Sequence, residues 1–163
     1  MRLLVAVDGS TECEACLGVA TKWADVLRAS VYLLQVLDDL ASKRRRVNHG
    51  PRCVGCAEAE VLAMKKARTY LDELASRYGL PADSTRCLVC PNNDAVDEII
   101  TIAETKGVDL IVVSSRCWDW REQRAPGSVG SEVASSSACP VLCVPPSAAE
   151  VGRRASTVAS RQP

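Results

Sequence analysis

Short apolar runs alternate along this chain with longer segments in which apolar side chains recur every three or four positions. The short runs are rich in Val and Leu and end at turn residues, so each predicts a strand buried on both faces. They occupy residues 3–7, 31–37, 85–90, 109–114 and 139–145. The periodic segments between them predict helices.

Four helices are expected. Ser10 or Thr11 can cap the first, Gly79 stops the second, the third opens near Asp94, and the short fourth follows Ser128. The stripes expected to face the core are Cys13, Cys16, Leu17, Ala20, Trp23, Ala24 and Leu27 in the first helix, Ala57, Val61, Met64, Ala67, Leu71, Leu74 and Tyr78 in the second, and Val96, Ile99, Ile100 and Ala103 in the third.

Strands that alternate with helices indicate a parallel α/β sheet with right-handed crossovers. Ligands of such sheets bind outside the carboxyl ends of the strands, which here are residues 8–10, 36–38, 90–92 and 114–116. One domain is expected over residues 1–146. The tail, 147–163, is rich in Ser, Ala and Arg and is predicted to be disordered.

Charge and composition exclude some classes of function. The 163 residues carry 20 Lys and Arg against 20 Asp and Glu, and this zero net charge argues against bulk electrostatic binding to nucleic acid. No apolar run reaches the ~18–20 residues of a membrane span, and the N-terminus does not resemble a signal peptide. We therefore expect a cytoplasmic protein without nucleic-acid or membrane partners.

Three sequence blocks resemble the universal stress protein family, and the resemblance covers about residues 2–145. They are LVAVDGS at 4–10, GVDLIVV at 107–113, and Gly127-Ser128-Val129 placed twelve residues before CPVL at 139–142. The resemblance implies a Rossmann-like five-stranded parallel sheet of order 3-2-1-4-5 with helices on both faces. It also implies a homodimer through the last strand, which is otherwise an exposed apolar edge: Val141, Leu142, Cys143 and Val144.

Many members of that family bind ATP through the pattern Gly-x2-Gly-x9-Gly-Ser/Thr, in which glycines let the backbone approach the phosphates. This chain aligns as Ser114-x2-Cys117-x9-Gly127-Ser128, so both leading glycines are replaced. The resemblance implies that Asp8 contacts the ribose of the nucleotide and that Val36 contacts the adenine. Val129 also matches the family pattern. Conventional ATP binding is therefore doubtful. A plain strand-closing turn at Asp8 and a helix cap at Gly127-Ser128 explain the same residues without a ligand.

Nine cysteines are the unusual feature of the composition. Cys87 and Cys90 lie three apart in a strand and should face opposite sides of the sheet. Cys87, Cys139 and Cys143 are interpreted as small core residues. The other six are expected at the carboxyl edge of the sheet: Cys13, Cys16, Cys53, Cys56, Cys90 and Cys117.

Two CxxC pairs at that edge suggest a thiophilic metal. Cys13 and Cys16 are expected to share a face of a helix start, and Cys53 and Cys56 to lie in a loop, so the four form a hypothetical Zn²⁺ site. His49, Cys90 and Cys117 are reserve ligands. Two alternatives stay open for Cys13 and Cys16, namely core packing and thiol–disulfide chemistry.

No constellation of catalytic residues is evident, since the single His has no identifiable Ser or Cys partner. The leading hypothesis is a non-enzymatic stress-responsive regulatory protein with a degenerate nucleotide motif. The alternatives are a zinc-binding or redox-sensing module on the same fold, and an ATP-binding protein with a remodelled phosphate loop.

Overall fold

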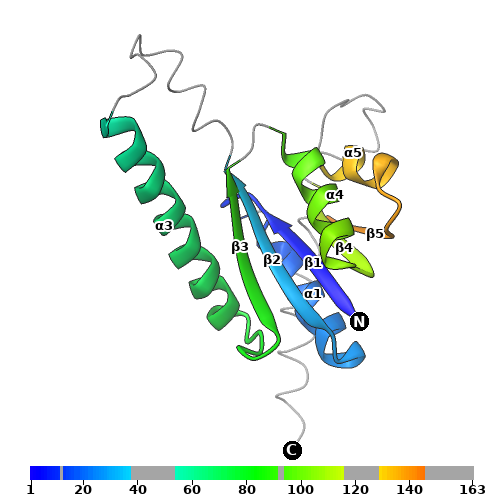
Figure 1. Ribbon diagram of the computed structural model, residues 1–163. Coiled ribbons are helices and arrows are strands. Elements are labelled where there is room, and N and C mark those ends of the chain that lie inside the picture. The colour runs from blue at the N-terminus through cyan, green and yellow to red at the C-terminus, as the bar shows by residue number, and fades with distance from the viewer. Residues whose placement is uncertain (12, 38–53, 92–93, 116–128, 146–163) are drawn as a thin grey trace, which may run out of the picture.

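The computed structural model describes residues 1–11, 13–37, 54–91, 94–115 and 129–145, without the side chains of residues 15 and 54–57. Five parallel strands form one sheet in the order β3-β2-β1-β4-β5, as predicted. In chain order the elements are β1 Arg2–Val7, α1 Ala15–Leu27, β2 Ser30–Leu37, α3 Val54–Arg77, β3 Thr85–Pro91, α4 Ala95–Lys106, β4 Leu110–Ser114, α5 Val129–Ser136 and β5 Val141–Val144 (Figure 1). The predicted tail at 147–163 lies outside the described residues.

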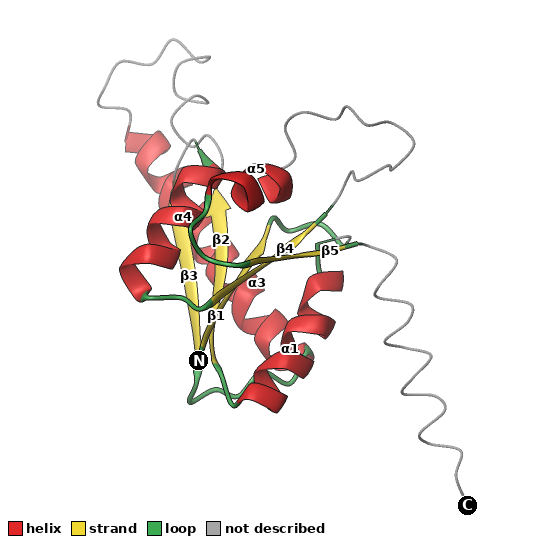
Figure 2. Cartoon of the chain, turned by 90° about the vertical axis from the view of Figure 1, so that its right-hand side faces the viewer, coloured by secondary structure: helices red, strands yellow, loops and turns green. Residues whose placement is uncertain are grey.

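Helices cover both faces of the sheet, also as predicted (Figure 2). One apolar cluster joins α1 and α3 to the face that carries Leu33. The other joins α4 and α5 to the face that carries Leu34. Neighbouring residues of a strand point to opposite faces, so every central strand must be apolar throughout. The continuous Leu and Val runs in the sequence have this cause.

The sheet register brings the carboxyl ends of the strands together at one edge. Val7, the last residue of β1, pairs with Gln35 near the end of β2. On its other side, β1 pairs with β4 as far as Val113. The turn after β1 is therefore flanked by the ends of β2 and β4.

Two helices begin elsewhere than the sequence indicated. We expected α1 to be capped by Ser10 or Thr11, but it begins at Ala15 after a turn that contains Cys13. Ser10 still acts on this turn, since its hydroxyl accepts a hydrogen bond from the backbone N–H of Cys13. The helix α3 begins at Val54, so Cys56 lies within it and not in the loop predicted.

Some apolar residues of the predicted stripes face solvent. Trp23 of α1 is 46% exposed and Val61 of α3 is 67% exposed. The first turns of α3 stand away from β3 in Figure 1. In α4, Ile102 is buried and Ile100 is only half-buried, the reverse of the prediction.

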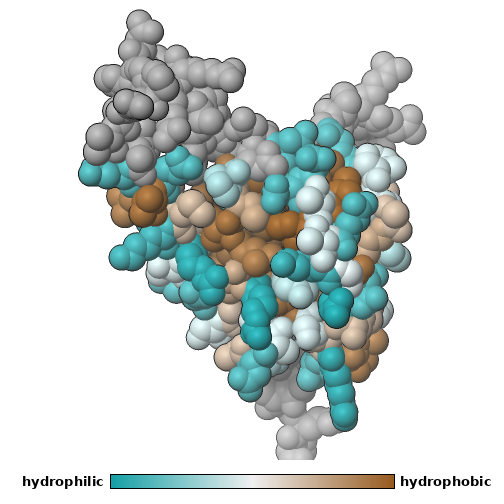
Figure 3. Space-filling view, in the orientation of Figure 1, coloured by the Kyte–Doolittle hydropathy of each residue, from teal (hydrophilic) through white to brown (hydrophobic). Residues whose placement is uncertain are grey.

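Apolar side chains are also visible between α3 and α4, over β2 and β3 (Figure 3). The second cluster includes half-buried residues of these two strands, Tyr32 of β2 and Leu88 of β3. Within the described ranges, the sheet is therefore covered less completely on this face near β3 than near β1.

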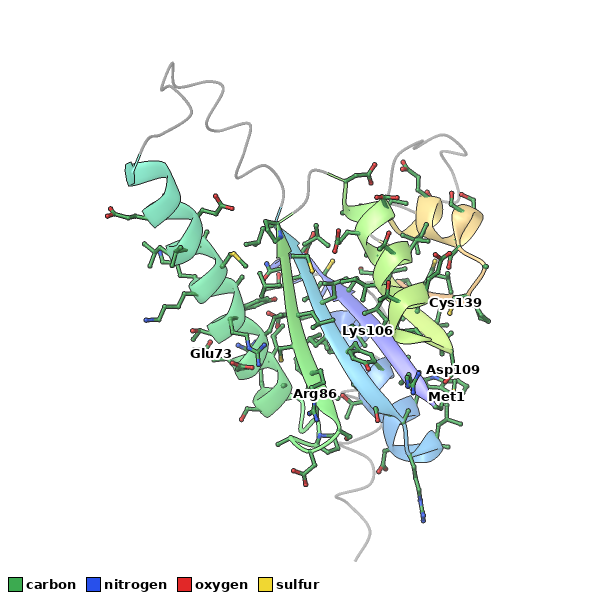
Figure 4. The ribbon with its side chains drawn as sticks, in the orientation of Figure 1. Met1, Glu73, Arg86, Lys106, Asp109 and Cys139 are labelled. Carbon is green, nitrogen blue, oxygen red and sulfur yellow. The ribbon has the colours of Figure 1, made fainter. Side chains whose placement is uncertain are left out.

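The opposite, amino-terminal edge of the sheet is closed by Arg2. Its backbone N–H donates to the Asp109 carboxylate over 2.7 Å, and its guanidinium donates to the carbonyl of Lys106 at the end of α4 over 2.9 Å. Figure 4 shows Asp109 beside Met1 at this edge. None of the described helices has the length and apolar character needed to cross a membrane.

Candidate functional site

The turn after β1 presents an ordered carboxylate at the carboxyl edge. One oxygen of Asp8 accepts hydrogen bonds from the backbone N–H of Ser10 at 2.9 Å and from its hydroxyl at 2.7 Å. Gly9 between them has φ +88°, a conformation that glycine adopts without steric cost. The local sequence therefore fixes the direction of the Asp8 carboxylate before any ligand arrives.

The end of β2 lies next to this turn and carries two different side chains. Val36 is half-buried and packs on the α4 side of the sheet. Gln35 is 8% exposed, and its amide nitrogen lies 3.3 Å from the position that a Cβ at Gly9 would take. Its carbonyl oxygen Oε1 is buried without a hydrogen-bond partner among the described residues. Sequence reasoning missed Gln35, although a lone amide in an apolar run was a signal.

The third part of the site is the end of β4, which α5 approaches closely. Ser114 is buried. A Cβ built on Gly130, in the first turn of α5, would lie only 3.0 Å from the carbonyl oxygen of Ser114. Val129, the first residue of α5, is exposed at this edge. Cys117, Gly127 and Ser128, the rest of the predicted phosphate loop, lie outside the described residues.

Asp8, Val36 and Ser114 thus come from three neighbouring strands and lie at one edge of the sheet, with Val129 beside Ser114. An oriented carboxylate at this edge is suited to accept hydrogen bonds from ligand hydroxyls. The first turn of a helix offers backbone N–H groups to an anion. The geometry therefore suits a ligand that has hydroxyl groups at one end and negative charge at the other.

The cysteines are distributed differently from the prediction. Cys87 and Cys90 lie in opposite apolar clusters, as expected. Cys87 is buried and Cys139 half-buried, but Cys143 is exposed and is not a core residue of this chain. Cys13 and Cys16, expected at the ligand edge, are both buried, and Cys16 belongs to the cluster beneath α1.

The Cys16 thiol is held in its protonated form. Its Sγ donates to the carbonyl oxygen of Cys13 over 2.8 Å. Burial, followed by the neighbouring charge of Cys13, raises the pKa of Cys16 to about 12. The pKa of Cys90 is likewise raised to about 11, first by burial and then by a hydrogen bond with Glu98. A helix start can stabilise a thiolate, but for Cys16 burial outweighs that effect.

The zinc hypothesis finds no support in this geometry. Within the described ranges, no three His, Cys, Asp or Glu side chains converge on a point that could hold a metal ion. Of the proposed ligands, His49, Cys53 and Cys117 lie outside those ranges, and the side chain of Cys56 is not described. Cys16 packs in the core and its raised pKa disfavours the thiolate that a metal needs.

A second cluster that the sequence did not indicate ties α1 to α3. The carboxylate of Glu14 accepts a hydrogen bond from the Tyr70 hydroxyl at 3.3 Å and pairs with the Arg77 guanidinium at 2.9 Å. Glu14 is the residue that immediately precedes α1. The start of α1 is therefore fixed from the side of α3, next to Cys13 and Cys16. The residues lie 56 and 63 positions apart in the chain, so no local pattern could reveal the contact.

Comparisons with known proteins agree with this fold. The model of the universal stress protein family matches residues 1–145. Universal stress protein YxiE of Bacillus subtilis is 30% identical over 149 residues, which cover 88% of this chain and 97% of that protein.

Two solved structures share the fold. A universal stress protein in complex with cAMP has a TM-score of 0.64 and 19% identity and covers 88% of this chain and 95% of its own. The Archaeoglobus fulgidus universal stress protein in complex with dAMP has a TM-score of 0.60 and 19% identity, with coverages of 88% and 97%. This chain belongs to the universal stress protein family.

Proposed function

We propose that this protein is a non-enzymatic regulatory member of its family that binds an adenine nucleotide at the carboxyl edge of the sheet. The observation that carries the proposal is the Asp8 carboxylate, which Ser10 orients beside the end of β2. Asp8 accepts hydrogen bonds from the ribose hydroxyls, and Val36 packs against the base. Similar proteins form complexes with cAMP and dAMP, which supports an adenine ligand.

The phosphate side of the site is remodelled. Ser114 and Cys117 replace the two leading glycines of the family pattern, and a side chain at either position restricts the approach of phosphate oxygens to the backbone. The start of α5 keeps its close approach to β4 because Gly130 has no Cβ. Its N–H groups serve a single phosphate. We therefore expect a nucleoside monophosphate to bind in preference to ATP.

Calorimetric titration of the purified protein with AMP, cAMP, ATP and GMP tests this function. AMP or cAMP should bind more tightly than ATP, and GMP most weakly. Asp8→Ala removes an acceptor of charged hydrogen bonds, which contribute about 1.5–3 kcal/mol each, so its affinity should fall about tenfold or more. The matched control is Asp83→Ala, since Asp83 is an exposed carboxylate before β3, at the opposite edge.

Absence of binding by all four nucleotides, or equal loss in the Asp8 and Asp83 variants, would contradict the proposed site. The non-enzymatic part has a separate readout. Nucleotide recovered after prolonged incubation should be chemically unchanged by chromatography. Release of phosphate or a cyclic product above the level seen with the Asp8→Ala variant would make the protein an enzyme.

A further inference from the structure

We propose that Cys13 and Cys16 form a reversible dithiol–disulfide pair, which exchanges with low-molecular-weight disulfides and weakens nucleotide binding when oxidised. The effect on binding rests on the function proposed above. The chemistry of the pair does not, and it follows from the turn that joins β1 to α1. No zinc site is needed to explain why two cysteines occur in this turn.

The backbone already holds the two cysteines at a distance that a disulfide requires. The N–H of Cys16 donates to the carbonyl of Cys13 over 3.2 Å, which closes a turn of four residues. Such a turn brings its first and last Cα atoms within about 7 Å, and disulfides span about 4.4–6.8 Å between Cα atoms. The Cys16 sulfur lies over this same turn, 2.8 Å from the Cys13 carbonyl oxygen. Bond formation therefore needs rotation of the side chains and only a small shift of the Cys13 backbone.

The two thiols have different surroundings, which assigns them different parts in the reaction. Cys16 is the second residue of α1 and is fully buried in the cluster beneath it. Cys13 lies before the helix and is 6% exposed. Glu14, held by Tyr70 and Arg77 of α3, fixes the start of the helix between them. Cys16 is thus the fixed partner, and Cys13 is the thiol that can turn towards solvent.

Weak hydrogen bonds permit that opening. The Cys13 N–H reaches the Ser10 hydroxyl over 3.3 Å, and the Glu14 N–H reaches the Ser10 carbonyl over 3.3 Å. Both are longer than the usual 2.9–3.0 Å or so of a strong N–H···O bond. A segment held by such contacts opens locally at low cost in free energy. Opening exposes Cys13 while Cys16 remains in the core.

The exchange balances with one oxidised glutathione as the probe disulfide. The Cys13 thiolate attacks one sulfur of the probe, which forms a mixed disulfide and releases one reduced glutathione. The Cys16 thiol then loses its proton to solvent and attacks the Cys13 sulfur, and the second glutathione leaves as a thiolate and is protonated. Two protein thiols are oxidised and one glutathione disulfide is reduced. Because burial raises the pKa of Cys16 to about 12, its thiolate is scarce near neutral pH, and the attack by Cys16 is the slower of the two steps.

Oxidation of Cys13 and Cys16 affects the proposed nucleotide site through the side chain of Ser10. The Ser10 hydroxyl accepts from the N–H of Cys13 and donates to the Asp8 carboxylate over 2.7 Å. A disulfide removes the Cys16 thiol as donor to the Cys13 carbonyl and draws Cys13 towards Cys16. The Ser10 hydroxyl then loses the Cys13 N–H that positions it, and its hydrogen bond to the Asp8 carboxylate is weakened. We expect the affinity for AMP to fall about tenfold, the worth of one hydrogen bond to a charged group.

Trypsin supplies a direct readout of the pair. Cleavage after Arg2 and Lys22 yields the peptide 3–22, in which Cys13 and Cys16 are the only cysteines. The reduced full-length chain is equilibrated without oxygen in glutathione buffers of graded ratio, quenched with acid, labelled with N-ethylmaleimide and digested. Peptide 3–22 should change from doubly labelled to unlabelled, with the mass of an internal disulfide. At the same ratios peptide 87–106 should remain labelled at both Cys87 and Cys90, which lie on opposite faces of the sheet.

Two single variants test the assigned parts. In Cys16→Ser, oxidised glutathione should trap an adduct on Cys13, and in Cys13→Ser the thiol of Cys16 should remain free. Peptide 3–22 of the unmodified chain remaining doubly labelled in pure oxidised glutathione would falsify the pair. An adduct on Cys16 in the Cys13→Ser variant would contradict the assignment of Cys13 as the attacking thiol.

The calorimetric comparison separates this inference from the proposed function. Reduced and oxidised chains are titrated with AMP under the same conditions. Weaker binding after oxidation, absent in the Cys13→Ser variant, supports the coupling through Ser10. Equal affinities overturn the coupling. If the disulfide forms but AMP binds neither state, the proposed nucleotide function fails while the dithiol chemistry stands.

Discussion

At the scale of single residues, two helical glycines show how local space decides the effect of one methyl group. Apart from the backbone of its own helix and its chain neighbours, Gly18 in α1 has no atom within 4 Å of the place where a Cβ would go, whereas Gly130 in α5 would bring its Cβ to 3.0 Å from the Ser114 carbonyl. Gly18→Ala should raise the free energy of unfolding by about 0.5–1 kcal/mol, since Ala is the better helix former. Gly130→Ala should lower it by about 1 kcal/mol, because the overpacking of about 1–3 kcal/mol exceeds that gain.

Urea unfolding of both variants beside the unmodified chain measures the two shifts. The opposite signs make the comparison sharp, because the same substitution is made in two helices of one sheet protein. A stabilised Gly130→Ala protein would show that α5 moves away from β4 without cost, and the close approach would then be unimportant for the site.

Single residues also show the limit of reading this site from sequence. Asp8, Val36 and Ser114 could be placed at one edge because they end apolar runs, and strand ends follow from the pattern. Cys13 and Cys16 could not be placed, since a cysteine satisfies an apolar stripe and a ligand set equally well. Burial, which raises the pKa of Cys16, distinguishes these cases, and it depends on how α1 is rotated against the sheet.

At the scale of elements, the Asp94 side chain caps the start of α4. The Asp94 carboxylate accepts from the backbone N–H groups of Val96 and Asp97 at 3.0 and 3.1 Å. Asp94→Ala should lower the free energy of unfolding by about 1 kcal/mol, while Asp94→Asn keeps an acceptor and should lose little. Denaturant titration of the two variants measures this difference. An equal loss of stability in both variants would mean that the negative charge of Asp94, and not its hydrogen-bond acceptor, stabilises α4.

The elements themselves could largely be predicted, and their ends could not. All five strands were predictable because buried parallel strands are mostly apolar along their whole length. The start of α1 was predicted several residues early, since Ser10 has the chemistry of a helix cap but bonds to Asp8 and to the turn at Cys13. Trp23 and Val61 fit the helical period, yet they are exposed, because periodicity does not report how far the sheet extends beneath a helix.

At the scale of the whole molecule, the buried Cys16 makes stability depend on alkaline pH. The pKa of this thiol is about 12 in the folded chain against 9.0 for the ordinary group, chiefly because of burial. Between these values the unfolded chain has lost a proton that the folded chain retains, so the free energy of unfolding falls as pH rises above about 9. The slope from this group is at most about 1.4 kcal/mol per pH unit. Below pH 9 both states hold the proton, so this thiol adds nothing to the pH dependence of the free energy of unfolding.

Comparison of the unmodified chain with Cys16→Ala isolates this contribution from other groups that titrate in the same range. Urea unfolding near pH 8 and near pH 10.5, in the presence of a phosphine reductant, should show a smaller loss of stability on raising the pH for the variant. Parallel pH dependences of the two proteins would mean that Cys16 ionises in the folded chain as easily as in the unfolded one.

The edge of the sheet at β5 is the feature from which we predict the oligomeric state of the protein. β5 is the last strand in the sheet order, its other side meets no strand of the described chain, and Cys143 on it is exposed. A short apolar edge strand is stabilised by pairing with a second copy, and a lysine on such an edge prevents pairing. We therefore predict a dimer through Val141–Val144.

Light scattering should give twice the chain mass, and Cys143→Lys should give the mass of one chain. The control is Ala82→Lys, an exposed position before β3 at the other side of the sheet, and it should remain dimeric. A single-chain mass for the unmodified protein at every concentration, or a dimer that survives Cys143→Lys with an unchanged dissociation constant, would place the interface elsewhere or remove it.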